Sequence, residues 1–384
     1  MFKNPFTPTF GGKPDFFFGR RGILDDFDKA MENRGSADRV LFVTGSRGCG
    51  KTALLEQFSQ RAAAQGRRTI DVNSENALGS LMRHLVRHQS VTKEIAPEVK
   101  VTVFGTGGKL GGVSSSKTTR YEKEDLEIVF CEACGAAEKG MFVSIDEVQK
   151  ISLDDLSAIC GAFQMASRKG YDVMLAIAGL PYAYDRIIQH EGCTYMRRSV
   201  HIRLGVFDRK EAAEAFLEAF GSIRGLSVED EALSCLVQAS YGHPYFIQLA
   251  GYALVDYVNG RNVGSKYAIT KADVEAILPE VIQSYEVRSL APIVDALPPS
   301  ARAYLEAMAR CIGEDHVART KDIAREMAKS PAQVSQTRQK LVSEGIAVAV
   351  ERGGLMFNIP YLRAYVSKRP ETGGEADLAR EWMF

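Results

Sequence analysis

The chain has 384 residues, with 48 basic and 48 acidic side chains and a formal net charge of zero. A balanced charge excludes binding to a polyanion through the overall charge, so any nucleic-acid surface must be local. With 45% hydrophobic residues the composition is that of a globular protein, and no apolar run approaches the length needed to span a membrane. Seven scattered cysteines, an odd number, indicate a reducing compartment and predict a cytoplasmic protein. The length predicts two or three domains.

The first half of the chain predicts an α/β domain. Residues 1–37 form a leader rich in Pro, Gly and Phe that ends in a helix. Residues 38–205 alternate strand and helix patterns, which predicts a parallel sheet wrapped by helices. A glycine-rich insertion over residues 99–116 is expected to be a flexible hairpin, with a substrate-touching loop as the alternative. The expected strands are Val40–Thr44, Arg68–Val72, Met141–Ile145, Val173–Ala178 and Val200–Leu204.

The most informative motif follows the first expected strand. Residues 45–52 fit G-x-x-x-x-G-K-[ST], the phosphate-binding P-loop, and helical spacing follows them. Glycines let backbone N–H groups turn toward phosphate oxygens, the lysine places a positive charge on the β- and γ-phosphates, and the threonine hydroxyl can bind Mg²⁺. The motif therefore predicts ATP and Mg²⁺ as ligands. The predicted nucleotide-binding residues are Gly45, Ser46, Arg47, Gly48, Cys49, Gly50, Lys51 and Thr52, with Lys51 also catalytic and Thr52 also a metal ligand.

A second part of the same site is predicted at the end of the third strand. The apolar run 141–145 ends in Asp146 and Glu147. A buried parallel strand delivers such acids at its C-terminal end, where ligands of open α/β sheets bind. We expect Asp146 to hold Mg²⁺ and Glu147 to act as general base toward the attacking water. A strand followed by an ordinary acidic loop is the alternative.

Hydrolysis also needs positive charge near the γ-phosphate, often from an arginine. Arg197 and Arg198 precede the fifth expected strand. We predict Arg198 as the catalytic arginine and Arg197 as the second choice. A solvated basic turn is the other interpretation.

Between Asp208 and residue 292 the pattern predicts only helices. Residues 208–211 resemble a capping box, with Asp in place of Ser or Thr. Residues 206–292 are predicted as a helical domain, and Pro298-Pro299 marks a boundary before the last one. The expected helices are Arg209–Ala219, Glu229–Ala239, Tyr245–Tyr257 and Lys271–Glu286.

Residues 293–369 predict a winged helix, followed by a tail over residues 370–384. Three helices are expected, the second with Thr320 as its N-cap, and the third is ended by Gly345. Two strands should follow, with residues 351–354 as the wing tip. The expected elements are Arg302–Cys311, Thr320–Met327, Ala332–Glu344, Ile346–Val350 and Leu355–Ile359.

A winged helix places its third helix in the major groove of DNA. Residues 301–369 carry twelve basic and seven acidic residues, a modest local excess of positive charge. DNA is therefore the predicted partner, and a surface for a protein partner is the alternative, since polar helix faces are usually just solvated. The predicted DNA-binding residues are Gln333, Ser335, Gln336, Arg338, Gln339, Lys340 and Arg352.

The motifs together resemble AAA+ ATPases, in the branch that includes archaeal and eukaryotic replication initiators, and more closely bacterial AAA family ATP-binding proteins. The similarity rests on the P-loop, on Ile145 to Gln149, on Ala178 to Pro181 and on Tyr241 to Tyr245. It implies that residues 206–292 are a helical lid. The resemblance further implies that Phe18, Gly19 and Arg20 contact adenine and that Arg198 acts in trans within a homo-oligomer.

Two departures from the family pattern predict slow hydrolysis. The end of the fourth strand has Ala178 and Gly179 where many relatives place a polar sensor, and the lid has His243-Pro244 where many place a second-sensor arginine. We therefore expect a slow ATPase that acts as a switch and binds DNA, without a membrane association. The alternatives are a signalling NTPase that binds a protein partner and a transcription regulator gated by ATP.

Overall fold

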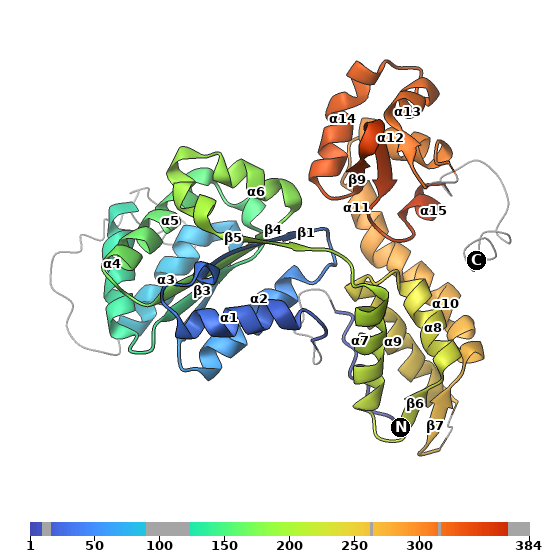
Figure 1. Cartoon of the computed structure of the whole chain (residues 1–384), viewed down its shortest axis with the longest axis horizontal. Helices are drawn as coiled ribbons and strands as arrows, with labels where there is room; N and C mark the ends of the chain where they lie inside the picture. Colours follow the sequence, from blue (N-terminus) through green and yellow to red (C-terminus); the bar gives the residue numbers. More distant parts are fainter. Residues whose placement is uncertain (10–16, 90–122, 262–263, 314–315, 368–384) are drawn as a thin grey trace, which may run out of the picture.

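The computed structural model of the protein describes residues 1–9, 17–89, 123–261, 264–313 and 316–367. Figure 1 shows three parts: a sheet covered by helices, a bundle of helices, and a C-terminal unit beside the bundle. The expected insertion at 99–116 and the expected tail at 370–384 lie outside the described residues.

The first part is an α/β domain with a parallel sheet of five strands, as predicted. The strand order is β2-β3-β4-β1-β5. All four pairings are parallel. β4 therefore lies between β1, which leads into the P-loop, and β3, which ends at the two acids. The strands are β1 (Val40–Gly45), β2 (Arg68–Val72), β3 (Met141–Ile145), β4 (Val173–Gly179) and β5 (Val200–Leu204).

Helices cover both faces of this sheet because alternate strand residues are apolar on both sides. Phe142 of β3 packs with α1 and α2, where the rings of Phe27 and Phe58 stack at 4.4 Å. Its neighbours Met141 and Val143 point to the opposite face, toward α3, α4 and α5. The helices and short turns here are α1 (Arg21–Glu32), η1 (Ala37–Arg39), α2 (Lys51–Ala64), η2 (Ser74–Asn76), α3 (Ala77–Gln89), α4 (Lys123–Ala136), η3 (Val148–Lys150), α5 (Leu153–Arg168), α6 (Pro181–Ile188) and η4 (Glu191–Arg198).

The helical segment that follows begins with the predicted capping box. Asp208 N donates to Glu211 Oε2 at 3.1 Å, and Glu211 N donates to Asp208 Oδ1 at 2.8 Å. The prediction of a wholly helical pattern is wrong, because β6 (Leu226–Val228) and β7 (Tyr267–Ile269) pair in parallel. Three residues are too few to produce a visible alternation. The helices are α7 (Arg209–Gly221), α8 (Asp230–Ser240), α9 (Pro244–Gly260), α10 (Lys271–Tyr285), η5 (Glu286–Leu290) and α11 (Ala291–Asp295).

The C-terminal unit contains the expected helices and strands close to their predicted bounds. Its sheet has the order β8-β10-β9 and is antiparallel. Gly345 ends α14 with a φ of +73°, a conformation that favours glycine. The elements are α12 (Pro299–Arg310), β8 (Ala318–Arg319), α13 (Thr320–Glu326), α14 (Pro331–Ser343), β9 (Ala347–Val350), η6 (Glu351–Gly353), β10 (Gly354–Phe357) and α15 (Leu362–Ser367).

The predicted N-cap of α13 is wrong. Thr320 is the first helical residue, and Arg319 precedes it without a side-chain cap. Thr320 Oγ1 instead donates to the carbonyl oxygen of Gly353 at 2.7 Å. The hydroxyl therefore ties the helix to the turn between β9 and β10, a long-range contact that the local sequence does not indicate.

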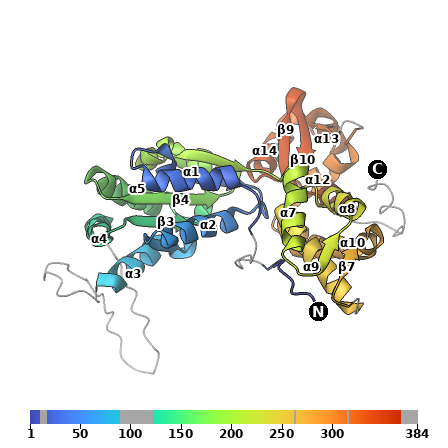
Figure 2. The same ribbon diagram turned by 60° about the horizontal axis from the view of Figure 1, so that its bottom comes forward.

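The helical segment and the C-terminal unit share one hydrophobic core. Phe246 of α9 stacks on Tyr361, with ring centroids 5.2 Å apart. The Tyr361 hydroxyl donates to the carbonyl oxygen of Ala239 at 2.7 Å. Phe6 of the leader is buried in the same core. Figures 1 and 2 both place these two parts beyond the same end of the large sheet. The shared core packs them into one unit.

Candidate nucleotide site

The loop after β1 has the backbone that a phosphate cradle requires. Gly48 and Gly50 have φ values of +77° and +94°, which L side chains rarely adopt. A Cβ atom on Gly48 would lie 2.6 Å from His243 Cε1, and one on Gly45 would lie 2.5 Å from Cys49 Sγ. Glycine is thus required by conformation at position 50, by space at position 45 and by both at position 48.

Two side chains of the loop, Lys51 and Cys49, are buried against its backbone. Lys51 is 6% exposed, and its Nζ donates to the carbonyl oxygens of Gly45 at 3.0 Å and Ser46 at 2.8 Å. Cys49 is buried, and burial raises the pKa of its thiol. Arg47 is exposed. Cys49 therefore fills space, and Lys51 is the cation held inside the loop.

The two predicted halves of the site meet. Thr52 Oγ1 at the start of α2 donates to Asp146 Oδ2 at 2.5 Å. Asp146 Oδ1 in turn accepts from the backbone N–H of Glu147 at 2.7 Å. The hydroxyl and the carboxylate are the hard oxygen donors that Mg²⁺ prefers, and Mg²⁺ usually takes only one or two carboxylates besides waters and phosphate oxygens. Within the described residues there is no cluster of three or more His, Cys, Asp or Glu that suits a metal. The donor pair therefore fits Mg²⁺ bound together with a nucleotide.

Glu147 is held in a left-handed backbone conformation, with a φ of +51°. Its Oε2 accepts from Gln149 Nε2 at 2.7 Å and lies 3.9 Å from Lys150 Nζ. The side chain is half-buried. Sequence reasoning did not assign a role to Gln149, since nothing local reveals where its amide points.

The residues predicted to contact adenine lie at the junction between the sheet domain and the helical segment. The Phe18 ring is 7% exposed and packs near Phe6, with ring centroids 6.4 Å apart. The Arg20 guanidinium lies 4.7 Å above the Phe207 ring, and Arg20 also donates to the carbonyl oxygen of Gly205. A Cβ atom on Gly19 would lie 2.9 Å from Phe207 Cε1. Phe207 is a junction residue that the sequence did not single out.

His243 connects the helical segment to the P-loop. Its Nε2 lies 3.3 Å from the carbonyl oxygen of Arg47, and since a carbonyl only accepts, Nε2 carries the hydrogen. Burial lowers the pKa of His243 to about 4, so the ring is neutral at physiological pH. The contact of His243 with the P-loop depends on the tertiary structure, and the local sequence does not indicate it.

The predicted catalytic arginines are not part of this cluster. The pairing of β1 with β5 places Val200 beside Leu41 and Leu204 beside Gly45. Arg198 precedes Val200, so it lies more than ~13 Å along the strand from the P-loop of the same chain, at about 3.3 Å per residue. Arg197 is exposed and donates through Nε to the carbonyl oxygen of Ile188 at 2.7 Å. Both arginines therefore precede the end of β5 that lies opposite the one beside the cradle.

The candidate DNA-binding residues lie on α14 and on the turn after β9. Gln333 also serves as a cap, because its Oε1 accepts from the backbone N–H of Ser330 at 2.8 Å. Arg338 is half-buried at the side of the helix, and Lys340 Nζ lies 3.9 Å from Glu344 Oε1. Arg352 belongs to η6. Of the candidate residues on α14, those exposed to solvent are Gln333, Ser335, Gln336, Gln339 and Lys340.

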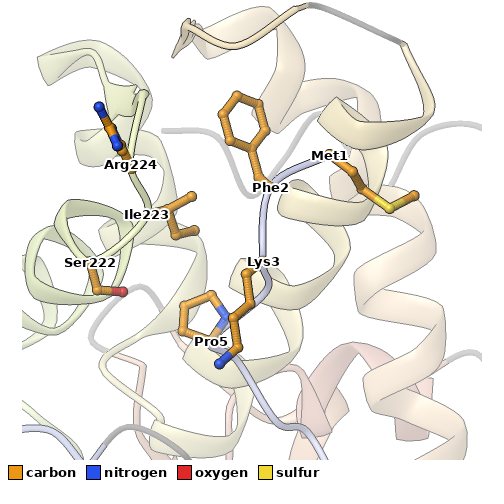
Figure 3. Close-up of a pocket in the computed structure, with 7 residues that line it drawn as sticks. All are labelled: Met1, Phe2, Lys3, Pro5, Ser222, Ile223 and Arg224. Carbon is orange, nitrogen blue, oxygen red and sulfur yellow. The ribbon is translucent and has the colours of Figure 1, made fainter.

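An open pocket of about 640 Å³ lies elsewhere, between the first five residues and residues 222–224 after α7. Figure 3 shows the side chains that line it, among them Phe2, Lys3 and Ile223. None of the predicted site residues lines this pocket. The cradle at the end of β1 remains the candidate site.

The strand order, the P-loop and the acids after β3 define a P-loop nucleoside triphosphatase fold of the α/β class. Residues 17–175 match the family model described as "AAA ATPase domain". This part of the chain is an AAA+ P-loop ATPase domain, as the sequence predicted. Residues 289–366 match a second family model, described as "Domain of unknown function (DUF8462)".

A solved structure agrees with this fold assignment. The ORC2 protein of Aeropyrum pernix, solved as ADPNP and ADP complexes, is 16% identical with a TM-score of 0.62, over 95% of this chain and 97% of that one. CDC6P from Pyrobaculum aerophilum is 15% identical with a TM-score of 0.47, over 94% and 96% of the two chains. The RuvB Holliday junction branch migration motor of Thermotoga maritima is 14% identical with a TM-score of 0.46, over 94% and 98%. No curated protein matches the chain in sequence. In the described part of the chain, every helix is too short or too polar to cross a membrane.

Proposed function

We propose that the protein binds ATP with Mg²⁺, hydrolyses it slowly, and uses the nucleotide state to control DNA binding by its C-terminal unit. The observation that carries the proposal is the contact between Thr52 and Asp146, which joins the P-loop to the acid after β3. The fold relative ORC2 was solved with ADPNP and ADP, which supports a nucleotide as the ligand.

Each residue of the candidate site has its own role in the proposed reaction. The N–H groups of residues 45–50 and Lys51 would hold the phosphates, with Thr52 and Asp146 as ligands of Mg²⁺, which neutralises phosphate charge when bound. Phe18, Gly19 and Arg20 would border the adenine. Glu147 takes a proton from water as the water oxygen bonds to the γ-phosphorus and the bond to the β-phosphate oxygen breaks. The products are ADP and inorganic phosphate.

Slow turnover follows from what the cradle lacks. Ala178 and Gly179 end β4 without a polar side chain, and His243 is neutral where a cation would stabilise phosphate charge. The catalytic arginine would have to come from a second copy of the chain, with Arg198 acting in trans. A turnover below ~1 s⁻¹, the low end of typical enzymes, is expected for the isolated chain.

One hydrogen bond and one close approach connect the cradle to the rest of the molecule. His243 contacts the carbonyl oxygen of Arg47. A Cβ atom on Gly345, at the end of α14, would lie 3.2 Å from Pro181 Cγ and 3.6 Å from Ser46 Cα. A change in P-loop conformation would therefore press on both the lid and the C-terminal unit, which share one core. Such a coupling is what a nucleotide-dependent switch needs.

We propose that the chain divides at 37/38, 205/206, 292/293 and 369/370, and that residues 293–369 are a winged helix. The exposed polar face of α14 and Arg352 on the turn after β9 would contact DNA bases and phosphates. Seven free cysteines fit a cytoplasmic location, where thiols stay reduced. A protein partner for the same face is the competing function, with an ATP-gated transcription regulator as a second.

Three measurements on the full chain test the proposal. Calorimetry with ATP and Mg²⁺ should give binding to the wild type and a large loss of affinity in Lys51→Ala. Phosphate release should be measurable in the wild type and lost in Glu147→Gln, which would still bind ATP. DNA affinity should fall with salt at a log–log slope near about −4.5, from roughly 0.9 per phosphate contact for five contacts. A chain that ignores ATP overturns the nucleotide proposal, and a salt-independent complex or none favours the protein partner.

A further inference from the structure

The inference rests on the proposed ATP hydrolysis. We propose that Gln149 is a positioning residue that orients the Glu147 carboxylate and occupies the place at the end of β4 where the chain lacks a polar side chain. The assignment depends on three hydrogen bonds, on the order of the strands and on the absence of a side chain at position 179.

The hydrogen bonds hold Gln149 at three points. Its Nε2 donates to Glu147 Oε2 at 2.7 Å, and its Oε1 accepts from the backbone N–H of Leu180 at 3.2 Å. Arg186 NH1 donates to its backbone carbonyl at 3.2 Å. The amide therefore bridges the general base after β3 and the residue that follows β4. Because the amide nitrogen donates and the amide oxygen accepts, only one orientation of the Gln149 amide satisfies both bonds.

The strand order gives this bridge its location. β4 lies between β1 and β3. Gly179 is beside Thr44, the residue before the P-loop, while Ile177 is beside Ile145 at the end of β3. The segment 179–180 thus lies between the cradle and the Asp146-Glu147 pair. A polar group here borders the space where water would attack a bound γ-phosphate.

Gly179 keeps this place open for Gln149. A Cβ atom on residue 179 would lie 2.8 Å from Gln149 Oε1 and 2.8 Å from Val148 Cγ1. The missing side chain at the end of β4 and the amide that reaches there from residue 149 are therefore complementary. Gln149, on η3 after β3, therefore reaches into the space that the missing side chain of residue 179 leaves open.

The bridge restricts the carboxylate of the general base. Both the Gln149 amide and the Lys150 ammonium contact Oε2 of Glu147, which leaves Oε1 to accept the proton from water. A carboxylate fixed by a hydrogen bond is preorganised, and misplacement of a catalytic group by about 1 Å can cost on the order of 10²-fold in rate. Gln149 acts on the reaction through Glu147.

The main test compares Gln149→Ala with a matched control. Gln60→Ala removes a similar amide-to-carboxylate bond, from Gln60 Nε2 to Glu56 Oε1 at 2.8 Å, in the second half of α2, about 12 Å along the helix from Thr52. Steady-state kinetics should show kcat lowered about 10-fold or more in Gln149→Ala with KM and ATP affinity unchanged, because orientation of a general base affects the chemical step. Gln60→Ala should match the wild type.

Gln149→Glu gives a readout that a merely structural role would not produce. A second carboxylate beside Glu147 disfavours the ionised pair, so the acidic limb of the kcat profile should move to higher pH. Lys150 and Arg186 oppose the shift, while Asp146 adds to it. The Tyr182 hydroxyl, which also lies near Glu147, is neutral because burial raises its pKa. The direction therefore depends mainly on the new contact.

A third readout needs no nucleotide. In the nucleotide-free protein, Glu147→Ala and Gln149→Ala should each lower the free energy of unfolding. The loss in the double variant should differ from the sum of the two single losses, because the two residues share one hydrogen bond. Additive effects, together with an unchanged kcat and pH profile in the Gln149 variants, overturn the inference even if the wild type hydrolyses ATP. No turnover in the wild type would instead overturn the proposed function, and non-additive unfolding would still support the bridge.

Discussion

Thr52 and Asp146 are 94 residues apart in sequence, yet their side chains meet at 2.5 Å between Oγ1 and Oδ2. β1 leads into the loop that carries Thr52, and β3 ends at Asp146, with β4 between them. The carboxyl ends of parallel strands lie at one edge of the sheet, which is where ligands of open α/β folds bind. The contact thus joins the P-loop to the carboxylate that we propose as a ligand of Mg²⁺.

We expect Thr52→Val to remove the benefit of Mg²⁺ for ATP binding. The substitution preserves shape but deletes the hydroxyl, one of two oxygen donors at the proposed metal position. Calorimetry should show ATP affinity without Mg²⁺ unchanged and the Mg²⁺-dependent gain reduced by about 10-fold or more, as for loss of one charge-assisted contact. Thr194→Val, on an exposed residue of η4, is the control. An undiminished Mg²⁺ effect would remove Thr52 from the metal site.

Gly48→Ala should weaken ATP binding strongly while leaving the fold intact. The backbone at position 48 has a φ of +77°, and the new methyl group would lie 2.6 Å from His243 Cε1. Strain of this kind costs on the order of 1–3 kcal/mol and must be relieved by a change in the loop. Gly221→Ala is the control, since nothing lies within 4 Å of a Cβ there. Equal ATP affinities in the two variants, measured by calorimetry, would contradict the cradle geometry.

Because His243 is buried in its neutral form, we expect the protein to lose stability at acidic pH. Burial lowers its pKa to about 4, whereas the unfolded chain titrates near its ordinary value of 6.5. Above pH 6.5 both states are neutral, and as the pH falls toward 4 only the unfolded state gains the proton. The free energy of unfolding should therefore fall by on the order of 3 kcal/mol between pH 6.5 and 4 from this residue.

Chemical denaturation of His243→Gln across this range checks the expectation. The variant should lack most of that dependence, while exposed His84→Gln on α3 should keep it. Identical pH profiles for the wild type and His243→Gln would show that another group is responsible.

Asp172 should be essential to the stability of the ATPase domain. It accepts hydrogen bonds from Arg67 at 2.7 Å and from Arg39, whose side chains are only 5% and 9% exposed. Burial alone would raise the pKa of Asp172, but these hydrogen bonds lower it below its usual value. Asp172→Ala would leave two buried guanidinium groups unpaired and should cost about 3–5 kcal/mol of unfolding free energy.

Urea denaturation measures that loss, with Glu326→Ala as the control. Glu326 pairs with Arg310 at 2.8 Å, but both side chains are exposed, so the expected cost is below about 1 kcal/mol. The stability from Asp172 should also decline as the pH falls through its lowered pKa, because the native carboxylate must then be protonated. Equal losses in the two variants would contradict the buried network.

Lys340→Gln should weaken DNA binding and reduce its salt dependence. One fewer phosphate contact lowers the magnitude of the log–log slope by about 0.9. Lys271→Gln is a matched control, since both lysines lie near a glutamate four residues later, at 3.9 Å for Lys340 and 3.7 Å for Lys271, and Lys271 lies on α10. A filter-binding titration against salt checks the slope. A common slope for the wild type and both variants would exclude Lys340 from a phosphate contact.

The sequence by itself determined the elements that depend on neighbours along the chain. Hydrophobic runs identified all five strands of the large sheet, and the glycine spacing identified the phosphate loop. The capping box at Asp208 and the glycine that ends α14 were also readable, because each depends on a few adjacent residues.

The tertiary structure alone decided which distant residues meet. Three contacts carry no local signal, since each joins segments packed together only after folding: the Gln149 amide with Leu180 after β4, His243 with the P-loop, and Arg20 with the Phe207 ring. Thr320 was misassigned as a cap because its hydroxyl bonds to Gly353 on another element. Strand order likewise placed Arg198 far from its own P-loop, because pairing partners are chosen by global packing and local periodicity does not specify them.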